Sequence, residues 1–162
     1  MRILGIDPGS RRTGYGIIVP NGPRLEAVTY GVVVLGDGEF SQRLRCLYDE
    51  MMAVIKTHQP TTVAVESIFY ARNASSALKL GHARGVALLV ASLADLETAE
   101  YAPTVVKQAV TSSGKASKAQ VQKMVSMLLG LKIPPATDAA DALAVAICHA
   151  REMRSKVLVH RQ

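Results

Sequence analysis

RILGIDPGSRRTGYGIIV, residues 2–19, is the stretch that decides the fold of this chain. It opens with a largely apolar run that reaches Asp7, turns at Asp7-Pro8-Gly9-Ser10, and continues into a segment at Thr13–Val19 that alternates around glycines. Such runs, separated by turn residues, predict two strands joined by a short connection. A carboxylate at the end of the first run would be costly unless something positive binds it.

The rest of the chain predicts a mixed α/β domain. Leu25–Leu35 is rich in valine and predicts a third strand of an antiparallel meander, and two further strands are expected at 61–65 and 97–101. Three antiparallel strands followed by two parallel ones, with helices on both faces, is the fold class that this order indicates. The expected helices are 41–59, 73–93, 103–110, 117–129, with Ser117 as N-cap and Gly130 at its end, and 138–153.

Size and composition limit the possible classes of protein. The 162 residues suffice for one domain, expected at 1–154, with a basic, flexible tail at 155–162. The apolar runs are too short for a membrane span or a signal peptide, and Cys46 and Cys148 are expected to be reduced, half-buried thiols, so a cytoplasmic location is expected.

The charge balance points to a polyanion. Nineteen Lys and Arg against thirteen Asp and Glu give a formal net charge of +6. A nucleic acid is the first candidate partner, because a phosphate backbone is the commonest polyanion that basic proteins bind. A basic protein without any such partner remains an alternative.

Four acidic residues stand out against this basic background: Asp7, Glu66, Asp138 and Asp141. Asp7 and Glu66 each end an apolar strand, and Asp138 and Asp141 share one face of the last expected helix. Carboxylates brought together repel one another, and a divalent cation relieves that repulsion. Two magnesium ions about 3.5–4 Å apart, held by such acids, hydrolyse phosphodiesters without histidine or cysteine ligands.

Each acid also has an ordinary structural explanation. Asp7 can belong to a simple turn, and Glu66 can be an exposed strand end. Asp138 can cap its helix, with Asp141 near the positive end of the helix dipole. The metal-site interpretation therefore depends on the combination of the four residues rather than on any one of them.

The motifs around these acids resemble those of one family, the RuvC-type Holliday junction resolvases. The similar segments are, in order, Gly5–Gly16, Glu66–Gly85 and Ala136–Leu143, so that the resemblance covers essentially the whole chain. It implies an RNase H-like fold and a homodimer. It also implies a crossover junction endodeoxyribonuclease that cuts two opposed strands of a four-way DNA junction during recombination and repair.

The resemblance further implies the cofactor, the partners and the catalytic residues. The family's four catalytic, metal-binding acids fall on Asp7, Glu66, Asp138 and Asp141. Some members carry histidine where Asp138 stands, so this chain is the all-carboxylate version. The expected cofactor is Mg²⁺, with Mn²⁺ as a substitute and two ions per active site. Besides junction DNA, a RuvAB-type branch-migration complex is the expected partner.

An aromatic block follows Glu66 and is expected to bind DNA. Phe69 matches the family aromatic that stacks on a base at the junction centre, and an exposed aromatic beside a nuclease site suits that role. A core phenylalanine is the alternative. Tyr70 and Arg72, in the same block, complete this group of candidates.

Lysines are expected to complete the DNA-binding surface. Lys107 and Lys118 match family lysines near the active site, which contact phosphate or the charge that develops on it. Lys115 and Lys123 extend this basic patch, although for these two an ordinary solvated surface is the favoured interpretation.

The helix expected at 73–93 carries Ala77, Gly81 and Gly85 at four-residue spacing. Two glycines within a helix cost about 1 kcal/mol each relative to alanine, so another element is expected to approach closely there. Packing on the sheet and a helix–helix contact at a two-fold dimer interface both explain the pattern. A symmetric dimer would present two equivalent sites to the two equivalent strands of a junction.

Three other functions fit parts of the sequence. Gly5-Ile6-Asp7 with Gly9, Gly14 and Gly16 also resembles the phosphate loop of actin-like ATPases and sugar kinases, which need two such domains and a nucleotide cleft between them. A YqgF-type RNA-processing nuclease is typically shorter and would lack the Phe69 block. A non-catalytic junction-binding protein would keep the acids without cutting.

Overall fold

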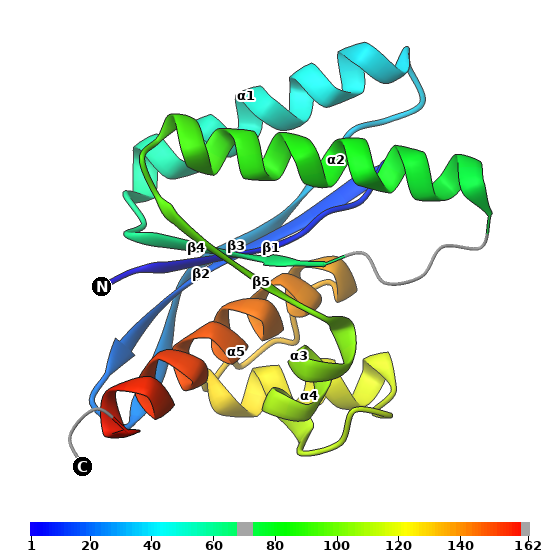
Figure 1. The fold of residues 1–162 in the computed structure, drawn as a ribbon. Helices are drawn as coiled ribbons and strands as arrows, with labels where there is room; N and C mark the ends of the chain where they lie inside the picture. The colour runs from blue at the N-terminus through cyan, green and yellow to red at the C-terminus, as the bar shows by residue number, and fades with distance from the viewer. Residues whose placement is uncertain (68–72, 160–162) are drawn as a thin grey trace.

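The computed structural model describes residues 1–67 and 73–159, which form one five-stranded sheet between two layers of helices (Figure 1). The strand order is β3-β2-β1-β4-β5. β1, β2 and β3 are antiparallel, and β4 and β5 run parallel to β1. The mixed sheet predicted from the sequence is therefore confirmed, with β1 Ile3–Asp7, β2 Arg12–Asn21, β3 Arg24–Val34, β4 Thr62–Glu66 and β5 Glu97–Tyr101.

Helices cover both faces of the sheet, as predicted. α1 (Phe40–His58) and α2 (Ala74–Leu93) lie on one face, and α3 (Pro103–Thr111), α4 (Lys118–Leu128) and α5 (Thr137–Val159) lie on the other (Figure 1). Each face has its own hydrophobic cluster, one packed beneath α1 and α2 and the other around α5. The central strands β1 and β4 are thus buried on both sides, and polar groups at their ends are where a site can open to solvent.

α5 lies directly on β1 and β2 because glycines leave room for its backbone. A side chain on Gly5 would collide with the carbonyl oxygen of Ala142, and one on Gly14 would collide with that of Asp138. The glycine pattern that also resembles a phosphate loop therefore serves close packing of sheet and helix here. This packing fixes the first turn of α5 against the ends of β1 and β2.

The boundaries of α4 follow the predicted capping residues. Ser117 is the N-cap and forms a capping box with Gln120, in which each side chain accepts a hydrogen bond from the other residue's backbone N–H. At the other end Gly130 adopts a positive φ of 62°, and the N–H of Leu131 donates to the Ser126 carbonyl at 2.9 Å. α4 is therefore held at both ends, and Lys118 is fixed at its first position.

α5 is longer than the sequence pattern indicates. It continues to Val159, whereas the helix was expected to end at about Met153. Apolar spacing stops before the basic segment that follows Met153, but no glycine or proline interrupts the chain there, so the helix can go on. The division into a domain at 1–154 and a flexible tail at 155–162 stays a prediction.

Two expectations from composition can be compared with the structure. Cys46 and Cys148 are both free thiols, but Cys148 is fully buried rather than half-buried, and burial raises its pKa to about 11. Among the helices of residues 1–67 and 73–159, none combines the length and apolar character that a membrane crossing requires.

Candidate active site

Asp7 and Glu66 lie side by side at the carboxyl ends of two neighbouring strands. β1 and β4 are parallel and pair Ile6 with Val65, and each acid is the next residue along its strand. The strands themselves are fully buried up to these acids, which are half-buried. The structure therefore brings together the two strand-end acids that the sequence predicts to converge.

These two acids are electrostatically coupled. Burial, and then the negative charges of Glu66 and Asp141, raise the pKa of Asp7 to about 8. Burial also raises the pKa of Glu66, while its hydrogen bond with Asp7 works in the opposite direction. Near neutral pH the pair therefore holds a proton that Asp7 donates to Glu66.

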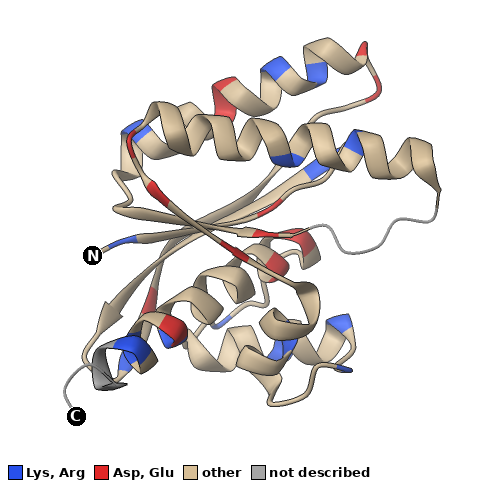
Figure 2. Cartoon of the chain, viewed as in Figure 1, with Lys and Arg blue, Asp and Glu red and all other residues tan. Residues whose placement is uncertain are grey.

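The two acids of α5 complete the acidic group. Figure 2 shows acidic residues where the ends of β1 and β4 face the start of α5. Asp141 lies close enough to Asp7 and Glu66 for its charge to raise the pKa of both. The pKa of Asp141 is itself raised, chiefly by burial. Asp138, one turn earlier, has 31% of its side chain exposed and lies at the rim of the group.

Each α5 acid has a cationic partner. The Lys118 Nζ lies 3.2 Å from the Asp141 Oδ2, and the Arg12 Nε lies 2.7 Å from the Asp138 Oδ2. The charge of Asp141 is the main reason why the pKa of Lys118 is raised. These two cations partly balance the acidic group, and each engages one carboxylate oxygen.

The predicted lysines divide into two groups. Lys118, at the start of α4, contacts Asp141, and the positive charge of Lys107 on α3 lowers the pKa of Glu66 and Asp141. Lys115 and Lys123 instead line a separate concave surface, together with residues such as Met124. The geometry thus associates Lys107 and Lys118, but not the other two lysines, with the acids.

The predicted aromatic block falls on a part of the chain that the structure does not describe. Phe69, Tyr70 and Arg72 lie outside the described residues, so their role in binding DNA stays a prediction. The other phenylalanine, Phe40, packs edge-on against His82 and under the Arg43 guanidinium, and so belongs to the α1–α2 layer.

The chemistry of the acidic group fits a hard divalent cation. Its four side chains offer only carboxylate oxygens, and three of them have raised pKa values because burial and mutual repulsion disfavour their charges. Within residues 1–67 and 73–159, no three His, Cys, Asp or Glu side chains form a preformed metal cluster. The two α5 carboxylates are turned to Lys118 and Arg12 instead.

The ion pair between Arg12 and Asp138 is a contact of this site that sequence reasoning missed. The two residues of the pair are 126 positions apart, and Arg12 follows a turn next to a second arginine, as solvated surface residues often do. Its position on β2 two residues before Gly14, against which the Asp138 backbone packs, brings it to Asp138 only in the folded chain.

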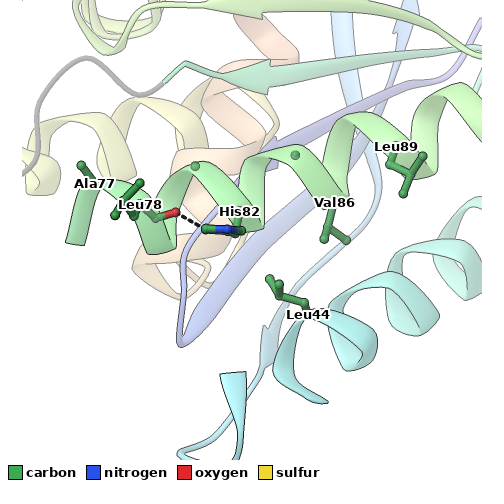
Figure 3. Close-up of a pocket in the computed structure, with 8 residues that line it drawn as sticks. Leu44, Ala77, Leu78, His82, Val86 and Leu89 are labelled. Atoms are coloured by element: carbon green, nitrogen blue, oxygen red, sulfur yellow. Dashed lines mark hydrogen bonds between the residues drawn. The ribbon is translucent and has the colours of Figure 1, made fainter. Parts of the chain in front are cut away.

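The outward face of α2 carries the predicted interface residues. A side chain on Gly81 or Gly85 would meet nothing within 4 Å, so packing on the sheet does not explain these glycines. Around them Leu78 and Leu89 are 64% and 52% exposed. Figure 3 shows this concave, mainly apolar surface, which α1 completes with Leu44. Within the described chain this surface has no covering element.

The chain is similar to one family of nucleases along almost its full length. Residues 3–149 match the family described as "Crossover junction endodeoxyribonuclease RuvC". The protein of that name from Stutzerimonas stutzeri is 51% identical over 155 residues, which cover 96% of this chain and 89% of that protein. The one from Syntrophotalea carbinolica is 56% identical over 151 residues, covering 93% and 94%.

A solved structure agrees with these sequence matches. Thermus thermophilus RuvC in complex with a Holliday junction substrate superimposes with a TM-score of 0.91 at 34% identity, covering 96% of both chains. The yeast mitochondrial Holliday junction resolvase Ydc2 has a TM-score of 0.67 at 15% identity, which shows a likeness of fold alone.

Proposed function

This chain belongs to the RuvC family of crossover junction endodeoxyribonucleases, the enzymes that resolve Holliday junctions, and we propose that Asp7, Glu66, Asp138 and Asp141 form its active site. The observation that carries the proposal is the convergence of Asp7 and Glu66 at neighbouring strand ends, with Asp141 near enough for its charge to raise the pKa of both. A family of metal-dependent nucleases needs such a group, because divalent cations bind where carboxylates would otherwise repel.

The four acids would hold Mg²⁺, or Mn²⁺ in its place, with two ions per active site. The metal, when bound, supplies an activated water and a positive charge for the leaving oxygen of the phosphodiester. Asp7 and Glu66 provide fixed ligands, because their strands are buried and hydrogen-bonded on both sides. Asp138 and Asp141 enter from the first two turns of α5, where other partners compete for them.

Two lysines would act on the substrate's charge. Lys118 forms an ion pair with Asp141. Lys107 lies near enough for its charge to act on the pKa of Glu66 and Asp141, against the larger effect of burial. Cations placed in this way stabilise the negative charge that develops on a phosphate during cleavage. Lys115 would contact the DNA backbone farther from the cut, and Phe69 would stack on a base at the junction centre, with Tyr70 and Arg72 beside it.

A homodimer would present two such sites to one junction. The proposed contact is the exposed face of α2 with Ala77, Gly81 and Gly85, where leucines and glycines lie uncovered. Glycines allow two helices to approach closely, and a two-fold axis gives each of two opposed strands the same active site. The dimer would act in the cytoplasm with a RuvAB-type branch-migration complex.

Cleavage of a synthetic four-way junction tests this function. In Mg²⁺ the protein is expected to nick two opposed strands of the junction, and to leave a linear duplex of the same sequence intact. Binding of the junction without any cut would favour the non-catalytic alternative. Preferential cutting of RNA would favour the RNA-processing alternative.

A further inference from the structure

Arg12 forms a direct ion pair with one of the proposed metal ligands. Its Nε donates to the Asp138 Oδ2 at 2.7 Å, with 54% of the Arg12 side chain and 31% of the Asp138 side chain exposed. Unlike Lys118, Arg12 matches no residue that the family resemblance assigns to the active site. The pair lies at the rim of the acidic group, where solvent reaches both side chains.

The backbone on the Arg12 side of this pair is fixed. Arg12 begins β2, directly after a loop that Thr13 closes. The fully buried Thr13 hydroxyl accepts a hydrogen bond from the Gly9 N–H at 3.2 Å and donates to the Gly9 carbonyl at 3.1 Å. The N–H of Leu35 donates to the Arg11 carbonyl at 2.8 Å, which ties the same loop to the end of β3.

The Asp138 side is fixed as well. The carbonyl of Asp138 lies so close to Gly14 that any side chain there would collide with it. The first turn of α5 therefore sits against β2 only two residues from Arg12. Both backbones are held by contacts of their own, so the ion pair joins two fixed positions.

Arg11 provides an internal comparison. It carries the same charge one position earlier, but its Nη2 pairs with the Asp37 Oδ1 at 3.2 Å. Those two side chains are 74% and 79% exposed, and Asp37 is none of the four acids. The two adjacent arginines thus differ in whether they touch the proposed metal site.

We propose that Arg12 is an internal counter-ion that competes with the divalent metal for Asp138. A carboxylate oxygen that accepts a charge-assisted hydrogen bond is a poorer metal ligand, and two cations at one carboxylate repel each other. A metal ion that binds this oxygen would therefore displace the guanidinium. This inference rests on the proposed metal site.

Calorimetric titration of Mn²⁺ into the protein without DNA tests the competition without using activity. Arg12→Gln removes the ion pair, and Arg11→Gln removes the same charge beside it. Exposed ion pairs are weak, so the dissociation constant of Arg12→Gln is expected to be about two- to fivefold below that of Arg11→Gln. Arg12→Lys, which keeps a cation opposite Asp138, should bind Mn²⁺ less tightly than Arg12→Gln. Equal dissociation constants for Arg12→Gln and Arg11→Gln would overturn the inference.

Asp7→Asn separates failure of this inference from failure of the metal site. If Asp7→Asn abolishes Mn²⁺ binding while Arg12→Gln behaves like Arg11→Gln, the metal-site assignment is retained and the proposed role of Arg12 is rejected. If Asp7→Asn binds Mn²⁺ as the wild type does, the metal-site assignment falls and the inference falls with it. Circular dichroism of each variant checks that the exposed substitutions leave the fold intact.

Discussion

Burial and then the charge of Glu66 raise the pKa of Asp7, and Glu66 lies this near because the two residues end neighbouring parallel strands, directly after the paired residues Ile6 and Val65. Two buried carboxylates in this position are unfavourable for folding, and the protein keeps them at the end of its most buried strands. The two carboxylates are therefore expected to lower the free energy of unfolding of the metal-free protein, by an amount that depends on pH.

The first prediction is that the metal-free protein loses stability as the pH rises from about 4 to about 8. The folded state keeps the Asp7 proton up to about pH 8, whereas the unfolded chain releases it near its ordinary pKa of 3.8. Between these values the folded state binds more protons, so raising the pH favours unfolding. Urea unfolding in a chelator at several pH values measures this slope.

Asp7→Asn is the matched variant for that slope. The amide cannot ionise, so the variant should be more stable than the wild type near pH 8 and much less dependent on pH. Saturating Mg²⁺ should stabilise the wild type at the same pH, because it binds the folded state alone. An equally steep pH dependence in Asp7→Asn would show that Asp7 is not the buried titrating group.

A second prediction concerns Lys118. Lys118→Met removes the cation 3.2 Å from Asp141 but keeps a chain of similar length. Loss of one group that stabilises developing charge typically costs about a hundredfold or more in rate, and a loss of this size is expected in single-turnover junction cleavage. Lys123→Met is the control, because Lys123 lines a different surface. Similar rates for the two variants would remove Lys118 from the active site.

A third prediction concerns Phe69. Phe69→Ala should weaken cleavage of the junction, because stacking of one base on an aromatic is worth about 1–3 kcal/mol. Phe69→Tyr keeps the ring and should retain most of the activity. Thermal unfolding of both variants measures whether the fold depends on this side chain. A large loss of stability in Phe69→Ala would favour the core-phenylalanine alternative.

A fourth prediction concerns the dimer. Leu78→Glu places a charge on the uncovered face of α2 and should convert the protein to a monomer in sedimentation velocity experiments. Met127→Glu, on α4, is the matched control, since the two side chains are 64% and 65% exposed. If both variants sediment like the wild type, the two-fold contact does not use this face of α2.

Much of the fold could be predicted from local sequence because its signals are local. Asp7 follows an apolar run and precedes a proline and a glycine, so the strand and its end are visible within a few residues. Ser117 and Gly130 mark α4 in the same way. The end of α5 was misjudged, because a helix can continue through polar residues that provide no apolar spacing.

Long-range contacts of the site could be predicted only in part. Asp7 and Glu66 could be placed together, because parallel strands bring their carboxyl ends to one edge. The partner of Asp138 could not be predicted, because nothing in the sequence near Arg12 distinguishes it from Arg11. The pairing depends on the close approach of α5 to β2, which Gly14 allows. The glycines of α2 left packing on the sheet and a dimer contact both open, and only the folded chain excludes the sheet, because a side chain at Gly81 or Gly85 would meet nothing within 4 Å.

The central claim is that Asp7 and its three acidic neighbours form one metal site that cuts junction DNA. Its most direct test is Mg²⁺-dependent cleavage of a synthetic four-way junction by Asp7→Asn, with binding of the junction measured in parallel. Asp49→Asn, which changes an exposed acid paired with Arg45 on α1, is the control. We predict that Asp7→Asn binds the junction but cuts it no faster than background, while Asp49→Asn cuts like the wild type. Normal cleavage by Asp7→Asn would contradict the account.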